Sequence, residues 1–212
     1  MRTTSHLDGC ARRSPTQQRG LERVSKVLAA AVEEFAAAGY EAVTMEAIAR
    51  RAKSPIGSLY QFFPNKQAIA RTLRARQIEH IAALWTALGQ DPECRSIDCF
   101  VARFMNVMAA FVAGHPAFLP LLDAPPSTLP PGARDRLRGL LAELLSVLEP
   151  RPSPVARRQC AIVILGVNKA LMGLYAEASA RDRTWIKKDY GTLLRSYLSA
   201  HVRTSTKKTR RA

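Results

Sequence analysis

The apolar residues of this 212-residue chain recur at steps of three and four almost throughout, and this spacing restricts the fold to packed helices. Gly39 ends one such stripe, because glycine adopts the left-handed conformation at a helix end without steric cost. Strand signals are absent, and no Asn-Gly or Asp-Gly turn separates the helical segments. The sequence therefore predicts an all-α fold of about nine helices. The clearest stripe comprises Val24, Val27, Leu28, Ala31, Phe35 and Ala38.

Breaks in this pattern divide the chain into an arm, two helical segments and a tail. Residues 1–18 are polar, basic and aperiodic, which predicts a flexible arm. The helical segments span 19–66 and 67–203. Residues 204–212 carry lysine and arginine but no acid, which predicts a solvated tail rather than a packed element.

The second helical segment begins with the longest predicted helix of the first half of the chain. Asn65 is a capping residue, and it precedes a helix from Lys66 to about Leu88. Further along, the stretch from Ala124 to Pro131 is rich in proline. That composition predicts the most mobile loop of the core.

The charge balance favours an anionic partner. The chain carries 32 Lys+Arg against 17 Asp+Glu, a formal net charge of +15. Nucleic acids and anionic membrane surfaces both attract such an excess, and charge alone does not choose between them. No apolar stretch approaches the roughly 18 residues that a bilayer span requires, and no secretory signal follows Met1. We therefore expect a cytoplasmic protein that does not enter the membrane.

Nothing in the sequence is typical of a catalytic, metal or cofactor site. It contains no His-Glu-x-x-His, no Gly-x-Ser-x-Gly, no phosphate-binding glycine loop and no dinucleotide fingerprint. Cys10, Cys94, Cys99 and Cys160 form no Cys-x-x-Cys pair, so reduced thiols are expected. A thiol sensor at Cys94 and Cys99 is a less favoured alternative, since spacing alone supports it. We expect neither an enzyme nor a bound metal.

Residues 44–62 have the pattern of a helix-turn-helix, in which a first helix braces a second that enters the DNA major groove. Thr44 can cap the first helix, and Ser54-Pro55 can start the second. Leu59 and Phe63 lie four residues apart and can pack inward. The residues left facing outward are Ile56, Ser58, Tyr60 and Gln61.

At these residues the chain resembles the TetR (AcrR-like) family of bacterial repressors. The resemblance covers about residues 20–70 and rests on 37–52 and 56–66, which include Gly-Tyr, Thr, Ile-Ala, Gly-Ser-Leu-Tyr, Phe and Lys at the family's spacing. It implies a DNA-binding head over 19–66 and a ligand-binding and dimerisation domain over 67–203.

The resemblance also implies roles for single residues. It implies that Thr44, Tyr60 and Lys66 contact DNA phosphates. The alternative for Lys66 is that it is simply the first residue of a helix. Gln61 could pair with adenine and Ile56 could meet a thymine methyl, whereas the alternative for Gln61 is a solvated polar residue. The family's base-reading positions are occupied by Ile56, Gly57, Ser58 and Gln61, with Met45 peripheral.

Two features depart from the family pattern, and the basic arm is a separate open question. Lys53-Ser54-Pro55 replaces the usual Gly-Val-Ser, so the turn between the two helices can be strained. Phe62 stands where a tyrosine or histidine commonly contacts the DNA backbone, which removes one hydrogen bond. Basic residues of the arm could reach a minor groove or remain idle; these are Arg12, Arg13 and Arg19.

The second domain offers candidates for an effector site. Asn168 would be a polar anchor on a buried helix, because an unpartnered amide there costs about 1–3 kcal/mol. A small apolar or aromatic effector follows from the lining, and the alternative is a filled core with no cavity. The candidate lining residues are Phe104, Met108, Phe111, Phe118, Asn168, Met172 and Tyr175.

The last two long helices are candidates for a dimer interface. The helix from Cys160 to Tyr175 is apolar on nearly all sides, which predicts burial on two of them. Gly166, Ala170 and Gly173 form a smooth stripe that permits close approach of another helix, either of a second copy or of the same subunit. The family resemblance favours a twofold four-helix interface. The final helix would contribute Leu193, Leu194, Tyr197 and Leu198.

Together these features predict a homodimeric repressor that binds a double-stranded DNA operator and is released by a small molecule. A ligand-independent repressor or an activator of the same fold is the alternative within this class. A basic helical protein on an anionic membrane surface is a less favoured alternative, because the apolar stripes face inward.

Overall fold

The computed structural model describes the backbone of residues 15–208 and, within them, the side chains of 19–175 and 177–202. This part of the chain is all-α, as predicted, and its α-helices number nine. They are α1 (Pro15–Ala42), α2 (Met45–Arg51), α3 (Ile56–Phe62), α4 (Lys66–Gly89), α5 (Ile97–Gly114), α6 (Phe118–Leu122), α7 (Ala133–Leu144), α8 (Pro154–Glu177) and α9 (Ala180–Lys208), with 3-10 turns η1 (Pro126–Thr128) and η2 (Leu145–Val147).

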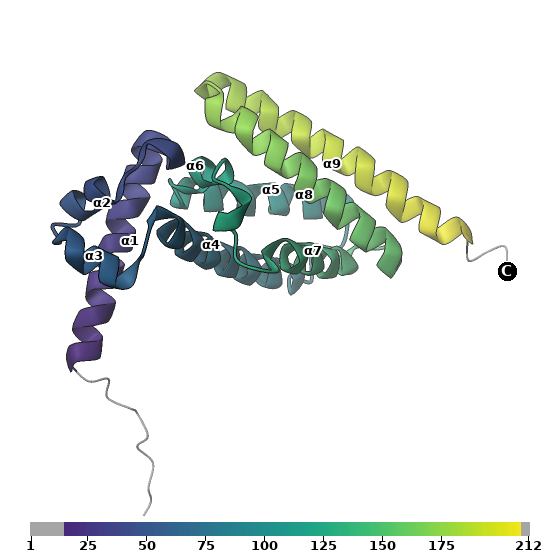
Figure 1. The fold of residues 1–212 in the computed structure, drawn as a ribbon. Coiled ribbons are helices and arrows are strands. Elements are labelled where there is room, and N and C mark those ends of the chain that lie inside the picture. Colours follow the sequence, from purple (N-terminus) through teal and green to yellow (C-terminus); the bar gives the residue numbers. More distant parts are fainter. Residues whose placement is uncertain (1–14, 209–212) are drawn as a thin grey trace, which may run out of the picture.

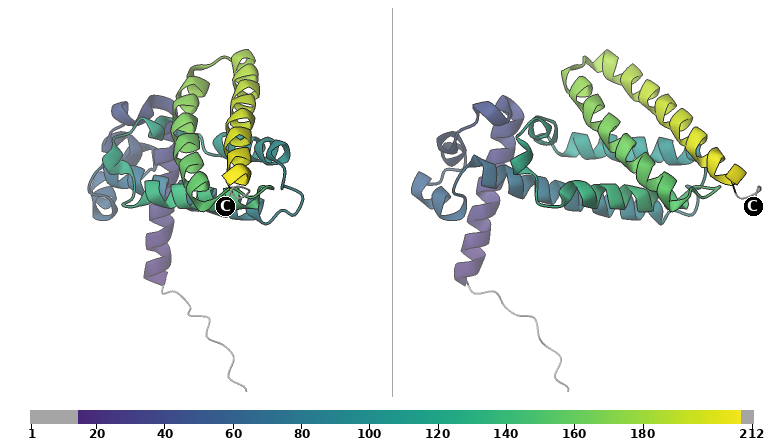
Figure 2. Two further views of the ribbon diagram at one scale, coloured as in Figure 1. Left: turned by 90° about the vertical axis from the view of Figure 1, so that its right-hand side faces the viewer. Right: turned by 45° about the vertical axis from the view of Figure 1, so that its right-hand side comes forward.

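The helices form a small head and a larger body. Helices α1, α2 and α3 make up the head, and α4 runs from it into the body beside α7 (Figure 1). Helices α8 and α9 lie side by side as a long hairpin on one side of the body, which both views of Figure 2 show. The head therefore stands at one end of α4, away from most of the α8–α9 hairpin.

The ends of the helical region differ from the prediction. Helix α1 begins at Pro15, so 15–18 belong to a helix and not to the predicted arm. Helix α9 extends over Ala180–Lys208, so the first residues of the predicted tail are helical. Its start has a local cause, because the Ser179 hydroxyl accepts a hydrogen bond from the Asp182 N–H at 3.2 Å. The remaining predictions for the arm and tail, over 1–14 and 209–212, fall outside the described residues.

Two hydrophobic cores stabilise the fold, and α4 belongs to both. Its first turns bury Ile69 and Leu73 in the head, while Ile81 and Trp85 lie in the body core. Helix α6 also joins the head: Leu121 is buried in the same cluster as the residues of α1, α2 and α3. The core of the head therefore extends past the boundary predicted at residue 66.

The proline-rich segment is fastened to α4 and is not the free loop that was predicted. Ser127 accepts hydrogen bonds from Gln67 Nε2 at 2.5 Å, through its Oγ, and from Arg71 Nη2 at 2.8 Å, through its carbonyl oxygen. Thr128 is fully buried, and its Oγ1 accepts a bond from Arg74 Nη1 at 2.6 Å. Three successive turns of α4 thus hold this segment in place.

Helix α5 is more apolar than the sequence analysis indicated. By length and composition alone, Ile97–Gly114 could cross a membrane, contrary to the expectation that no stretch approaches that length. Core helices pass the same test, and here Phe100 and Phe104 are buried in the body. Arg103, exposed on the same helix, pairs with Asp91. These contacts favour a core helix.

Candidate nucleic-acid interface and ligand cavity

Local capping positions the two short helices of the head. The Thr44 hydroxyl accepts a hydrogen bond from the Ala47 N–H at 3.2 Å and so caps α2, as predicted. Arg51 at the other end of α2 donates to Glu34 at 2.5 Å and to Glu33 at 2.8 Å, which ties α2 to α1. These contacts hold α2 as the brace for α3.

The turn between α2 and α3 places a lysine where the backbone is left-handed. Lys53 has a φ of 49° and lies just after the end of α2. Its N–H donates a hydrogen bond to the Arg50 carbonyl oxygen at 3.1 Å. The Ser54 N–H donates to the Ala49 carbonyl at 3.0 Å, which completes a Schellman turn. Glycine is the usual residue at this position, so the predicted strain of the Lys53-Ser54-Pro55 segment is present at Lys53.

We expect Lys53→Gly to raise the free energy of unfolding. A left-handed conformation costs an L-residue about 1–2 kcal/mol, and the greater freedom of glycine in the unfolded chain removes part of the gain, so the net increase should be about 0.5–1 kcal/mol. Urea unfolding of both proteins measures it. Lys53→Ala is the control, because it removes the charge but keeps the strain and should not stabilise the fold.

Helix α3 starts one residue later than expected. Ser54 does not cap it; Pro55 occupies the capping position, with no side-chain hydrogen bond, and the helix begins at Ile56. The helix then directs one face inward, since Leu59 is fully buried and Phe63 is buried beside it. This inward anchoring agrees with the prediction and fixes which face of α3 is free.

The free face of α3 carries most of the predicted DNA-contacting residues. Tyr60 has 48% of its surface exposed, and Ile56 and Gln61 are exposed next to it. No atom lies within 4 Å of the position that a Cβ on Gly57 would take, so the surface there is open to a close partner. Ser58 is half-buried.

Met45 and Lys66 point elsewhere. Met45 is only 7% exposed and packs in the head core, so a peripheral base-reading role does not fit it. Lys66 Nζ donates to the carbonyl oxygens of Tyr40 at 2.9 Å and Glu41 at 2.7 Å, and it lies over the Tyr40 ring. These bonds close the end of α1 and use two of the three donors of the ammonium. A phosphate contact by the third donor stays a prediction.

A cavity of about 690 Å³ lies in the body, between α4, α5, α6, α7 and α8. Met108, Phe118, Asn168 and Met172 line it, as predicted. Phe104 and Phe111 do not, because both are buried in the core beneath it. Tyr175 is half-buried and also lies outside the lining. The cavity contradicts the alternative of a completely filled core.

Helix α4 supplies lining residues that the sequence reading missed. Arg74, Gln77, Ile78, Ile81 and Trp85 all border the cavity. They follow one another at steps of one, three and four, so they share one face of the helix. The sequence signal for this wall was the presence of two polar residues, Arg74 and Gln77, within an apolar stripe. Their burial depends on a distant segment of the chain that covers them.

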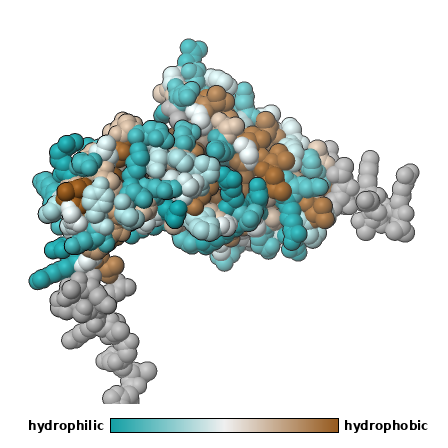
Figure 3. Space-filling view, in the orientation of Figure 1, coloured by the Kyte–Doolittle hydropathy of each residue, from teal (hydrophilic) through white to brown (hydrophobic). Residues whose placement is uncertain are grey.

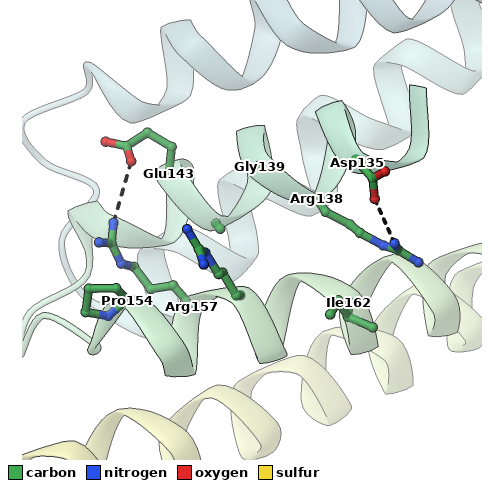
Figure 4. Close-up of a pocket in the computed structure, with 9 residues that line it drawn as sticks. Asp135, Arg138, Gly139, Glu143, Pro154, Arg157 and Ile162 are labelled. Carbon is green, nitrogen blue, oxygen red and sulfur yellow. Dashed lines mark hydrogen bonds and ion pairs between the residues drawn. The ribbon is translucent and has the colours of Figure 1, made fainter. Parts of the chain in front are cut away.

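A second, smaller hollow of about 450 Å³ lies between α7 and α8. Figure 4 shows Arg138 beside Asp135 and Arg157 beside Glu143. Arg138 Nη1 lies 2.9 Å from Asp135 Oδ1, and Arg157 Nη1 lies 3.7 Å from Glu143 Oε2. Two of the three arginines that line this hollow, Arg138 and Arg157, already have carboxylate partners, and the third, Arg158, is exposed. This smaller hollow is therefore the weaker candidate for a ligand site.

Helices α8 and α9 expose an apolar surface, and hydrophobic residues gather over this hairpin in Figure 3. Leu174 is 61% exposed, and Trp185 and Leu193 are also exposed. A Cβ on Gly166 or Gly173 would meet nothing within 4 Å, so the small-residue stripe does not pack within its own subunit. Of the other predicted interface residues, Leu194 and Leu198 are buried in the body core, and Tyr197 is half-buried.

The cysteines of the described residues are free thiols. Burial and the neighbouring Cys99 raise the pKa of Cys94 to about 11, so its thiolate, the reactive form, is scarce at neutral pH. Cys160 is buried in the core, as expected. A thiol sensor therefore gains no support from the environment of Cys94.

The head and the cavity-bearing body together define a class of protein. It is a helix-turn-helix protein whose second domain is all-helical and has a cavity of the size of a ligand site. Comparisons agree. A family model described as bacterial regulatory proteins, tetR family, matches residues 27–73, and a tetracyclin repressor-like C-terminal domain matches 96–198. The chain belongs to the TetR family of bacterial regulatory proteins.

Individual relatives support the same assignment. The HTH-type transcriptional repressor KstR of Rhodococcus jostii is 40% identical over 75 residues, which are 35% of this chain and 34% of that protein. KstR of Mycolicibacterium smegmatis is 39% identical over 62 residues, or 29% and 30% of the two chains. The match thus spans about a third of the length of these curated relatives.

Solved structures resemble most of the chain. A TetR-family transcriptional regulator from Streptomyces coelicolor has a TM-score of 0.63 and 27% identity, covering 84% of this chain and 99% of that one. The fatty acid degradation regulator FadR from Bacillus halodurans also reaches 0.63, at 14% identity, with coverage of 88% and 96%. The second likeness concerns the fold alone.

Proposed function

We propose that this protein is a cytoplasmic homodimeric repressor, not an enzyme, which binds a DNA operator through α3 and leaves it when a small molecule fills the body cavity. The observation that carries the DNA-binding part is the two-sided character of α3. Leu59 anchors the helix in the head, while Ile56, Tyr60 and Gln61 remain exposed on the other side. An anchored helix with an exposed polar face suits insertion into the major groove.

Contacts to DNA divide into positioning and reading. The Thr44 hydroxyl accepts one hydrogen bond at the start of α2 and keeps its own proton to donate to a phosphate. Tyr60 supplies a phenol for the same purpose. Gly57 lets the backbone approach, and Ile56, Ser58 and Gln61 face the bases. The net charge of +15 adds sequence-independent attraction.

Gln61→Ala and Tyr60→Phe should have different effects on DNA binding. Gln61→Ala is expected to relax preference at one operator position by about 1–3 kcal/mol, because it removes a base contact. Tyr60→Phe is expected to weaken binding to all sequences alike, because a phosphate contact carries no sequence information. Fluorescence anisotropy with specific and random duplexes separates the two. Equal losses on both duplexes for Gln61→Ala would contradict its role.

Communication between cavity and head requires an element that touches both. Leu121 of α6 lines the cavity and is also buried in the core of the head. Helix α4 spans the same interval, from Lys66 beside α1 to Trp85 in the cavity wall. A ligand that moves α6 or tilts α4 would change the separation of the two α3 helices in a dimer, which must stay near 34–36 Å for successive major grooves.

Selection of bound sequences from a random duplex pool, repeated with candidate effectors, tests the proposal. Recovery of a palindrome that is lost when an effector is added supports it. Equal operator affinity with and without a saturating effector would leave a ligand-independent repressor. Binding to anionic liposomes at physiological salt without any selected duplex would favour a membrane-surface protein.

A further inference from the structure

The body cavity has more positive than negative groups in its wall. Arg74, Arg134, Arg138 and Lys169 line it, together with the single carboxylate of Asp123. Arg138 pairs with Asp135, which lies outside the lining. In the part of the chain that the structure describes, the other three cations form no ion pair. The wall therefore holds uncompensated positive charge.

Arg74 is the unusual member of this set because it is buried. Only 9% of its surface is exposed, and its hydrogen bond goes to a neutral group, Thr128 Oγ1. A guanidinium has five N–H donors, and within the described residues Arg74 uses only one of them in a hydrogen bond. Burial and the nearby charge of Arg134 lower the pKa of Arg74, which shows that its charged form is disfavoured here. A buried charge of this kind needs an anion.

Neutral polar groups beside Arg74 are also incompletely bonded. Gln77 lies one turn further along α4, is buried, and makes no hydrogen bond within the described residues. Across the cavity, Asn168 Oδ1 is buried without a hydrogen-bond partner. Amide groups can complete the coordination of a ligand head that a guanidinium holds.

Apolar side chains of α4 line the cavity beyond Arg74. Ile78, Ile81 and Trp85 follow on the same face of α4, and Met108 and Met172 lie in the wall beside them. From Arg74 to Trp85 the helix rises by about 16 Å, at roughly 1.5 Å per residue. A ligand that fits such a wall has a charged end and an apolar body of comparable length.

We propose that the effector is an amphipathic anion, with one carboxylate or phosphate head bound by Arg74 and Arg134 and an apolar body lying toward Trp85. This inference rests on the proposed function and replaces the purely apolar or aromatic effector expected from the sequence. A neutral ligand would displace water from Arg74 without supplying a counterion. The head would lie next to Thr128, in the segment that joins α6 to α7.

Tryptophan fluorescence tests the inference directly. The chain has two tryptophans, so Trp185→Phe leaves Trp85 in the cavity wall as the reporter. The probes are dodecanoate, dodecyl phosphate and dodecan-1-ol, each below its critical micelle concentration. Both anions should bind at least about tenfold more tightly than the alcohol, since charge-assisted hydrogen bonds are roughly twice as strong as neutral ones. The anion that binds with the higher affinity identifies the head group that the cavity prefers.

Substitutions locate the head group. Arg74→Gln should weaken both anions about tenfold while leaving dodecan-1-ol unchanged. Arg134→Gln, at an exposed position that tolerates substitution, should weaken them severalfold and serves if Arg74→Gln does not fold. Arg76→Gln is the matched control, because Arg76 is exposed on the same helix but outside the cavity lining. Arg76→Gln should leave the affinity for all three probes unchanged.

Three results would overturn the inference: equal affinity for the alcohol and the anions, anion affinity that survives both Arg74→Gln and Arg134→Gln, or no anion binding. Operator binding gives a separate readout. An anion that binds through Arg74 without releasing the operator supports the ligand chemistry and refutes the proposed release mechanism. Release of the operator by a neutral compound, but by no anion, would support the proposed release mechanism and refute the inferred ligand chemistry.

Discussion

Leu174→Glu is expected to convert the proposed dimer into a monomer and to weaken operator binding by about 10²–10⁴-fold, the loss that follows when two linked binding events become independent. Leu174 is 61% exposed and lies beside the glycine stripe of α8. In a twofold interface each patch meets its own copy, so the substitution enters the interface twice and places like charges near each other.

Sedimentation and fluorescence anisotropy on a two-site duplex measure this effect. Ala87→Glu is the matched control, because it adds the same charge at an exposed position of another helix in the body, α4. We expect it to remain dimeric and to keep its operator affinity. A Leu174→Glu protein that stays dimeric at micromolar concentration would show that the interface lies elsewhere.

Local chemistry explains why the head could be predicted from the sequence. Thr44 and Asn65 cap their helices through their own side chains, and Asn65 Oδ1 accepts a hydrogen bond from the Ala68 N–H at 2.9 Å. Leu59 and Phe63 are four residues apart, so helical geometry alone puts them on one face. The strain at Lys53 was visible as a missing glycine.

Long-range packing explains what the sequence reading missed. Nothing within the five residues of α6 indicates that Leu121 is buried against the head, because the partner residues lie about 60 to 90 positions earlier. Arg74 resembles an ordinary surface arginine until Thr128 and its segment cover it. Lys66 and Met45 were assigned to DNA from their family positions, whereas the fold directs one to carbonyl oxygens and the other to the core.

The same separation of local and distant contacts bears on function. Residues that face DNA must remain free, so their neighbours in the sequence determine where they point. Residues of the cavity are contributed by α4, α5, α6, α7, α8 and the segment that joins α6 to α7, so the cavity exists only once the body has folded. Leu121 both lines the cavity and is buried in the head core, so under the proposed mechanism the head core would respond to a ligand.

Phe35→Ala is therefore expected to remove operator binding while sparing the body. Phe35 is fully buried at the centre of the head core and stacks on Tyr40, with ring centroids 5.8 Å apart. Removing such a side chain costs about 3–5 kcal/mol, a large part of the ~5–15 kcal/mol that stabilises a whole domain. Urea unfolding and operator binding measure the two consequences.

The control for Phe35→Ala is Phe62→Ala, because Phe62 is 36% exposed on α3 and leaves no comparable cavity. We expect it to lower the free energy of unfolding by less than about 1 kcal/mol. Ligand binding reported by Trp85 should persist in Phe35→Ala, since Trp85 belongs to the body core and Phe35 to the head core. Loss of both operator binding and ligand binding in Phe35→Ala would mean that the two cores unfold as one unit. Coupling between the cores through Leu121 would then be stronger than their separation suggests.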